Sequence, residues 1–251
     1  MRVHGQTDNL LTLQTFLHDN IMNKRFTVPF LLLAVLFCIF LVVANLLEVK
    51  VVKLGPLSAT AGLVVFPLSY IINDCIVEVY GFQRARFVIW LGFLMNLVVV
   101  LLVQLALVLP PDPVWTGQQA METVYGSTPR ILLASFMAFV CGSMVNAYVM
   151  SRMKVMSRGR HFSARAILST LFGESVDSIV FFPIAFGGVL PWSTVLTLVW
   201  SQAVIKTGYE VVVLPVTLKV VAYIKRREQI DTYDDASSGV DYRWWRIDKI
   251  D

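Results

Sequence analysis

The sequence predicts an all-α, polytopic membrane protein with six transmembrane helices. Hydrophobic residues make up 57% of the chain and gather in long uninterrupted runs. The run Val28–Leu47 holds one polar residue, Asn45, and the run Phe87–Leu109 holds only Asn96 and Gln104. An apolar run of about 18 residues or more is long enough to cross the hydrocarbon core of a bilayer as a helix, and soluble proteins rarely need repeated runs of that length.

The expected spanning segments are 28–49, 58–79, 87–109, 130–151, 166–188 and 193–223. The second segment has the shortest clean apolar part, contains Pro67 and continues into Asp74 and Glu78. A proline inside a membrane helix requires other protein groups to satisfy the freed carbonyl, so a kinked or partly broken helix facing the bundle is expected. Pro183 and Pro215 predict bends in the fifth and sixth helices.

Polar segments flank the predicted membrane domain. We expect a cytoplasmic N-terminal segment over residues 1–27, a membrane domain over 28–224 and a cytoplasmic tail over 225–251. The first apolar run is too long for a cleavable signal peptide and no small-residue cleavage site follows it. The acidic stretch Asp231–Gly239 predicts a loosely ordered segment. The aromatic and basic run over 242–246 predicts either contact with the membrane surface or a solvated tail.

Lysine and arginine are concentrated in alternate connections. They are Lys24, Arg25, Arg84, Arg86, Arg152, Lys154, Arg158, Arg160, Arg165, Lys225, Arg226 and Arg227. The long connection over 110–129 carries only acidic charges, and Lys50 and Lys53 are the exceptions. The positive-inside rule then places both termini in the cytoplasm, as six crossings require. Topology explains the net charge of +4 better than nucleic-acid binding does.

Signatures of metal, redox or hydrolytic chemistry are missing from the sequence. The three cysteines lie inside apolar segments without paired spacing, so no disulfide framework, metal site or cofactor is expected. There is no phosphate-binding glycine loop, no H-E-x-x-H motif and no nucleophile–base pair. Asp74 and Asp177 could formally supply an intramembrane aspartyl pair, but their surroundings match no such motif. We therefore expect no enzyme, while an intramembrane enzyme or a structural membrane subunit stays the alternative from another class.

A row of small residues runs along the fourth predicted helix. Ala134, Ala138, Gly142 and Asn146 recur at intervals of four. Such rows allow helix backbones to approach closely. The row predicts packing inside the monomer, with a homodimer contact as the alternative.

Three helices carry ionisable pairs inside apolar sequence: Asp74 with Glu78, Glu174 with Asp177, and Lys206 with Glu210. Residues three or four apart share one helix face. A charge within the bilayer is costly and normally faces a protein interior or a watery cavity, so the three stripes are expected to line one chamber. With five acids and one base, this chamber suits a substrate rich in N–H donors or carrying an ammonium group. The alternatives are that Glu78 reaches water at its helix end and that Lys206 and Glu210 form a structural pair.

Amide and aromatic side chains add to this predicted site. The amides are Asn45, Asn73, Asn96, Asn146 and Gln202, and the aromatics are Phe66, Tyr70, Phe181, Phe182 and Trp200. Amides read the edges of planar heterocycles by paired donor and acceptor contacts. The aromatic rings either stack on such a ring or serve as packing. Shared protons on neighbouring acids would also allow proton coupling.

The stretch Phe66–Gly81, which reads FPLSYIINDCIVEVYG and is followed by Arg84 and Arg86, resembles the signature of the queuosine precursor transporter family, a group of vitamin-uptake-transporter-like membrane proteins. Further agreement lies in Asn45 to Lys50, in Arg165 through Ser169 with Glu174, Asp177, Ser178, Phe182, Ala185 and Phe186, and in Lys206, Glu210 and Pro215. The resemblance covers roughly residues 28–225.

This resemblance implies a bacterial inner-membrane importer similar in fold to the substrate-binding components of energy-coupling-factor vitamin transporters. Its small-molecule substrates would be 7-deazaguanine bases, namely the nitrile or aminomethyl precursor (preQ0 or preQ1) or queuine. The expected substrate-binding residues are Asn45, Asn73, Asp74, Glu78, Glu174, Asp177, Gln202, Lys206 and Glu210. Glu174 or Asp177 would meet the base edge, and Asp74 and Glu78 would form the gate or meet the amine. Asn45 and Gln202 would support the base, and Lys206 would balance charge or meet the carbonyl oxygen.

One departure from the resemblance concerns partners. Energy-coupling-factor binding components dock through an Ala-x-x-x-Ala pattern in the first helix, where this chain reads Ala34-Val35-Leu36-Phe37-Cys38. We therefore expect a solitary carrier working by alternating access in the lipid bilayer, with no ATPase module and no nucleic acid. The alternative is a binding component for another vitamin or nucleobase that works with an ATPase partner.

Overall fold

The structure is a computed structural model that describes residues 26–47, 50–54, 57–126, 129–188, 191–234 and 240–245. Its helices are α2 (Val28–Leu47), α3 (Phe66–Tyr80), α4 (Phe82–Val108), α5 (Gln118–Tyr125), α6 (Pro129–Met156), α7 (Phe162–Phe186) and α8 (Trp192–Glu228). A hairpin of β1 (Val51–Leu54) and β2 (Leu57–Thr60) and a 3₁₀ turn, η1 (Ala61–Val64), join α2 to α3. Among the described residues, six helical segments are long and apolar enough to cross a membrane, which confirms the predicted class of polytopic, helical membrane protein.

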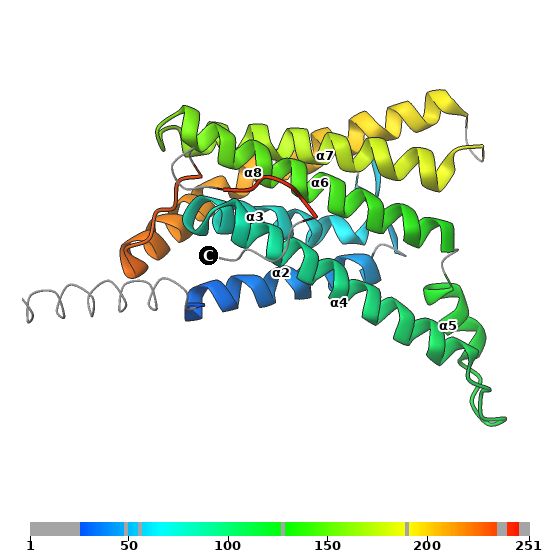
Figure 1. The fold of residues 1–251 in the computed structure, drawn as a ribbon. Coiled ribbons are helices and arrows are strands. Elements are labelled where there is room, and N and C mark those ends of the chain that lie inside the picture. The colour runs from blue at the N-terminus through cyan, green and yellow to red at the C-terminus, as the bar shows by residue number, and fades with distance from the viewer. Residues whose placement is uncertain are drawn as a thin grey trace, which may run out of the picture.

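Helix α3 forms the centre of the bundle. Every residue of α3 except Leu68 is buried, and α3 contacts α2, α4, α6, α7 and α8. Figure 1 shows α2 and α4 along the lower side of α3, with α6 and α7 along its upper side. The outer helix faces carry exposed apolar side chains such as Leu32, Leu101 and Val212. Such surfaces suit contact with lipid, because lipid tails are as apolar as leucine.

The predicted start of the second spanning helix at residue 58 is wrong. Residues 57–60 form β2, which pairs antiparallel with β1, so that Lys53 lies opposite Ser58. Helix α3 begins at Phe66, and Pro67 therefore lies in its first turn. A proline there removes no hydrogen bond within the helix, because the first N–H groups have no acceptor inside it. The segment expected to be kinked or partly broken is interrupted just before Pro67, where the 3₁₀ turn η1 gives way to α3, whereas Pro183 and Pro215 lie inside α7 and α8.

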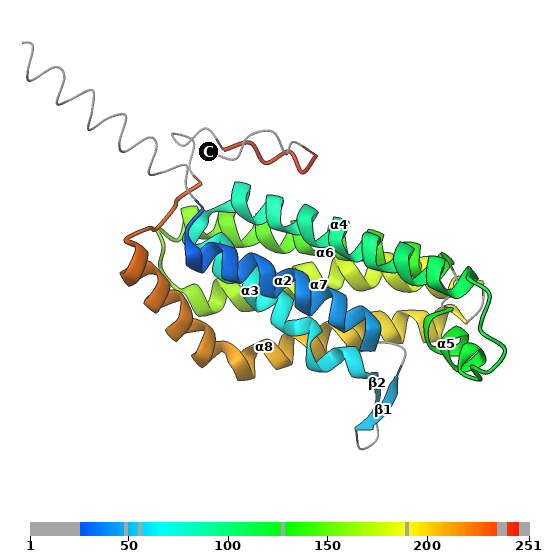
Figure 2. The ribbon, with the colours of Figure 1, turned by 90° about the horizontal axis from the view of Figure 1, so that it is seen from below.

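The two ends of the bundle differ in charge. We call the end at which α2 begins and α8 ends the basic end, because Lys154, Arg165 and Lys225 lie there close to one another around Glu78. The β-hairpin and α5 lie at the opposite end (Figures 1 and 2).

The acidic tail is ordered where it first leaves α8, contrary to the expectation of a loose segment. Asp234 is only 4% exposed, and the Phe82 backbone N–H donates to its Oδ2 at 2.9 Å. The Ser151 hydroxyl also donates to Asp234, and the Thr232 N–H donates to the Val79 carbonyl at 3.1 Å. Asp234 thus satisfies a free N–H at the start of α4, where a negative charge is also favoured by the helix dipole. Residues 235–239 of the predicted loose segment lie outside the described residues.

Tyr242 and Trp244 in the aromatic part of the tail pack on the bundle, while Trp244 and Trp245 stay half exposed and Arg246 lies outside the described residues. The Tyr242 ring lies 5.1 Å from that of Phe82 and 5.2 Å from that of Tyr148. Trp244 stacks on Trp90 at 6.1 Å, and the Trp90 indole N–H donates to the Trp244 carbonyl at 2.8 Å. These contacts, which connect residues more than ninety positions apart, join the tail to α4 and α6.

Candidate functional site

Four helices bring buried polar side chains together in the middle of the bundle. Asp74 on α3, Asn146 on α6, Glu174 on α7 and Glu210 on α8 are each at most 1% exposed. We define the central polar cluster as Asn73, Asp74, Asn146, Glu174, Asp177, Lys206 and Glu210. Five of the six ionisable residues that the sequence singled out lie in this cluster, and Glu78 lies outside it.

Lys206 is the cation of the central polar cluster. Its Nζ lies 2.9 Å from Oε2 of Glu174 and 3.4 Å from Oδ2 of Asp177. The same ammonium lies 3.9 Å from the centre of the Phe66 ring, at cation–π distance. Glu174 and Asp177 are three residues apart on α7, so one lysine from α8 meets both of them. The cluster therefore presents two carboxylates, one ammonium and an aromatic face within one small volume.

Asp74 and Glu210 form the other part of the cluster. Asn146 donates through Nδ2 to Oδ1 of Asp74 at 2.8 Å. Glu210 lies beside Asp74 and Thr170. Among the described residues, no donor in hydrogen-bonding geometry reaches Oδ2 of Asp74 or either carboxyl oxygen of Glu210.

Two glycines allow α6 and α7 to approach closely enough to close the cluster. A Cβ at Gly142 would lie 2.9 Å from the Gly173 carbonyl oxygen, and a Cβ at Gly173 would lie 2.9 Å from the Gly142 carbonyl oxygen. The row of small residues predicted on this helix is the surface used here, since Ala134, Ala138 and Asn146 are fully or almost fully buried within the chain. In the structure, this row therefore packs inside the monomer.

Glu78 is the centre of a separate ion-pair network at the basic end. Arg165 holds it with two hydrogen bonds, from Nη1 to Oε2 at 2.6 Å and from Nη2 to Oε1 at 3.1 Å. Lys225 Nζ lies 2.6 Å from Oε1, and Lys154 Nζ lies 3.9 Å from the same oxygen. The network joins α3, α6, α7 and α8. The alternative that Glu78 reaches open water at its helix end is therefore wrong, because the side chain is buried among these cations.

The basic partners of Glu78 were not predicted to lie in the interior, because their positions at the ends of apolar runs are typical of loop charges that set topology. Their spacing held a usable signal. Lys154 continues the buried row of α6 that includes Asn146 and Met150, and Arg165 lies twelve residues before Asp177 on α7, with Ser169 and Gly173 at the intervening steps of four. A basic residue in register with a buried polar row is a candidate for the interior.

The tail closes this network from outside. Lys154 donates to Asp231, to the Glu78 carbonyl and, at 2.7 Å, to the Thr232 carbonyl. Lys225 Nζ lies 2.9 Å from Oδ1 of Asp231. Partial burial raises the pKa of Asp231, but hydrogen bonds and charge from Lys154 and Lys225 outweigh this and hold the pKa below its ordinary value.

Replacing Asp231 with asparagine is expected to loosen the tail at neutral pH. Because the folded-state pKa of Asp231 is depressed, its contribution is fully present above the unfolded-state pKa of about 4 and is lost as the pH falls through the folded value. Protection of the tail against protease should therefore drop in Asp231→Asn at pH 7, and the difference from the parent should shrink below about pH 4. Asp112→Asn, in an exposed loop, is the matched control. An equal difference at both pH values would contradict this account.

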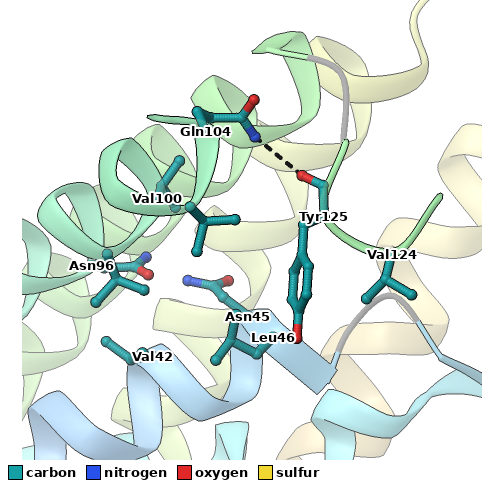
Figure 3. A pocket seen from close by; sticks show the side chains of 10 residues that line it. Val42, Asn45, Leu46, Asn96, Val100, Gln104, Val124 and Tyr125 are labelled. Atoms are coloured by element: carbon teal, nitrogen blue, oxygen red, sulfur yellow. Dashed lines mark hydrogen bonds between the residues drawn. The ribbon is translucent and has the colours of Figure 1, made fainter. Parts of the chain in front are cut away.

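Neither Asn45 nor Gln202 makes a hydrogen bond to a described residue of the central polar cluster. Asn45 accepts a hydrogen bond from the Ser135 hydroxyl at 3.2 Å and lines a small open pocket between α2, α4 and α5. Figure 3 shows its amide beside Asn96 and Tyr125, below the hydrogen bond from Gln104 to the Tyr125 carbonyl. Gln202 is half-buried one turn before Lys206. Its side chain makes no hydrogen bond to any described residue of the cluster. Within the described ranges, no group of histidine, cysteine or acidic side chains could hold a metal ion.

Comparison with known proteins agrees with this architecture. A family profile described as "Putative vitamin uptake transporter" matches residues 60–220. The chain is 33% identical over 175 residues to a Bacillus subtilis (strain 168) protein named "Probable queuosine precursor transporter", covering 69% of this chain and 76% of the relative. It is 28% identical over 141 residues to the Escherichia coli (strain K12) protein named "Queuosine precursor transporter", covering 56% of this chain and 61% of the relative.

A Haemophilus influenzae protein named "Probable queuosine precursor transporter" is 27% identical over 128 residues, about half of each chain. No solved structure matches the chain. The matched region begins in β2 and ends inside α8, and so it includes every residue of the central polar cluster. Six membrane-spanning helices, a buried polar cluster and these relatives together show that the chain belongs to the vitamin uptake transporter family.

Proposed function

We propose that this protein imports a queuosine precursor, a 7-deazaguanine base, across the bacterial inner membrane. The observation that carries the proposal is the central polar cluster, in which carboxyl and amide oxygens exceed the donors available to them. Oxygens of Asn73, Asp74, Asn146 and Glu210 meet no donor among the described residues. Burying an acceptor without a donor is costly, so the cluster favours a ligand that supplies N–H groups. The names of the relatives support the choice of ligand.

The chemistry of a deazaguanine base fits the part of the cluster around Lys206. Its base edge presents a ring N–H and an amino group side by side, which a carboxylate accepts as a pair of charge-assisted hydrogen bonds. Glu174 or Asp177 would meet this edge, and Lys206, already between them, would turn to the carbonyl oxygen of the base. The ring would replace the ammonium over Phe66. An aminomethyl base or queuine would add an amine for the remaining carboxylate.

We infer that the basic end faces the cytoplasm. Lysines and arginines on this end follow the positive-inside rule, and Lys154 and Arg165 are part of its ion-pair network. The network around Glu78 would then be the closed cytoplasmic gate of an alternating-access cycle. Release of the substrate would require Glu78 to part from Arg165 and Lys225, so the gate residue predicted from the sequence acts through its cationic partners.

Uptake by cells that cannot make queuosine tests the function and the site together. We expect the protein to restore uptake of a labelled 7-deazaguanine base in such cells, including a strain that lacks every energy-coupling-factor module. Glu174→Gln and Asp177→Asn should each lower uptake by about a hundredfold or more, since losing a charge-assisted pair costs about 1.5–3 kcal/mol per bond, while membrane insertion persists.

Glu122→Gln on the exposed helix α5 serves as the control and should transport normally. Near-normal uptake by both acidic variants would remove Glu174 and Asp177 from the site. Uptake only in the presence of the ATPase module would favour the role of a binding component instead of a solitary carrier.

A further inference from the structure

We propose that Asp74 and Glu210 form a proton-binding site that couples the entry of a proton to that of the substrate. This inference rests on the proposed transport function and names its driving ion. The two carboxyl groups come from different helices, α3 and α8, and lie side by side in the interior, 0% and 1% exposed. A movement of α8 relative to α3 would therefore separate or join them.

The hydrogen bonds of the pair are incomplete without an added donor. Asp74 receives one bond, from Asn146 to Oδ1, and its Oδ2 receives none from the described residues. Glu210 lies close to both Asp74 and the Thr170 hydroxyl, yet neither carboxyl oxygen is satisfied by a described residue. A single proton on either acid would become the donor that the pair lacks, because a protonated carboxyl donates one hydrogen bond.

The charges around the pair lead to the same conclusion. Among the ion pairs formed by described residues, none includes Asp74 or Glu210. The groups that face the pair are Tyr70, Cys75 and Glu78 on α3, Asn146 on α6, and Thr170 and Glu174 on α7. Lys206, one turn before Glu210 on α8, lies 2.9 Å from Glu174 and 3.4 Å from Asp177, its acidic partners.

Two adjacent carboxylates in such a place cannot both stay ionised without great cost, as in dyads that share one proton. A buried pair without a paired cation is therefore expected to hold a proton whenever the interior is closed to water. Opening to the cytoplasm would hydrate the pair, lower the cost of charge and release the proton.

The position of the pair makes coupling to the substrate direct. Glu210 lies one turn after Lys206 on α8, and Asp74 lies one turn before Glu78 on α3. The proton site thus lies between the carboxylates proposed to hold the base and the network proposed to close the cytoplasmic side. The buried carboxylates would be fully compensated only when a proton occupies Asp74 and Glu210 and the base occupies its site. Closure of the carrier would then require proton and substrate together.

The test uses the full-length protein in liposomes with a labelled 7-deazaguanine base outside. An inside-alkaline gradient of one pH unit should raise steady-state accumulation up to about tenfold, because one pH unit supplies about 1.4 kcal/mol per proton. A protonophore should abolish this gain. A pH dye trapped inside should report acidification when substrate is added, and this measurement needs only the unmodified protein.

Asp74→Asn and Glu210→Gln locate the site. In each variant, uptake with the gradient should be close to uptake without it, so that their ratio approaches one. A purely structural defect would instead lower both rates and leave their ratio at the value of the parent protein. Glu122→Gln should keep the ratio of the parent protein. An unchanged ratio in both acidic variants would overturn the assignment to this pair, even if coupling exists.

Other outcomes separate this inference from the proposed function. Uptake that ignores the pH gradient, with no internal acidification, would overturn proton coupling while leaving transport in place. Uptake driven by a sodium gradient at constant pH would replace the proton by another cation. Failure to take up any 7-deazaguanine base under every gradient would instead overturn the proposed function.

Discussion

Glu78→Gln is expected to destabilise the folded protein by about 3–5 kcal/mol, the usual consequence of removing one partner from a buried ion pair. Arg165 is 1% exposed and makes two hydrogen bonds to the Glu78 carboxylate. Glutamine cannot supply the negative charge, so the guanidinium would remain buried without compensation. Lys154, 2% exposed, would keep Asp231 as its acidic partner, but Lys225 would lose one of two.

Thermal or denaturant unfolding of the purified protein in detergent measures this effect. Glu122→Gln, on the exposed helix α5, should leave the midpoint unchanged. The double variant Glu78→Gln with Arg165→Met should be more stable than Glu78→Gln alone, because replacing a whole buried pair by apolar groups costs less than leaving one charge unpaired. A Glu78→Gln variant within about 0.5 kcal/mol of the parent would mean that water reaches the network and that Glu78 is no closed gate.

Gly173→Ala is expected to abolish most transport and to cost about 1–3 kcal/mol of stability, as overpacking of a well-packed interior does. A Cβ there would lie 2.8 Å from the Asn146 Cβ, 2.9 Å from the Gly142 carbonyl oxygen and 3.1 Å from the Tyr70 ring. None of these three is the end of a flexible chain, so α6 and α7 would have to separate. Asn146 would then withdraw from Asp74, and Glu174 and Asp177, which flank the crossing on α7, would shift with their helix.

Gly208→Ala is the matched control for this change. Gly208 lies inside α8 between Lys206 and Glu210, and a Cβ there would meet no atom within 4 Å. The same substitution should therefore preserve transport and stabilise the protein slightly, since alanine is favoured over glycine in a helix interior by about 1 kcal/mol. Uptake and the thermal midpoint should be measured for both variants. Equal behaviour of the two would show that the close approach of α6 and α7 is not required.

The membrane class and five of the six spans could be predicted closely because they depend on local composition. A span must be apolar over a length set by the bilayer, and that length can be counted along the chain. The second span could not be placed as well. Its first part is a short apolar run, which suits a strand as well as a helix, and the pairing of β1 with β2 decided in favour of a strand over 57–60.

Sequence spacing alone also identified the acids that the structure buries in the bundle interior. Charged residues three or four apart in apolar helices must share a face, and lipid would reject that face. The family resemblance was likewise carried by local motifs. What spacing could not provide was the sorting of these acids into three groups, with Lys206 between Glu174 and Asp177, Asp74 beside Glu210, and Glu78 among cations.

Only the tertiary structure decided this sorting, because it depends on the depth at which separate helices cross. From the sequence, Arg165 and Lys154 look like loop charges. In the structure, α6 and α7 extend far enough to include them and place them beside Glu78. From the sequence, Asp231 and Asp234 look like part of a loose tail. In the structure, Asp231 pairs with Lys154, and Asp234 accepts the free N–H at the start of α4. Hydrophobic length is a property of consecutive residues, whereas the partner of a buried charge is a property of the packed bundle.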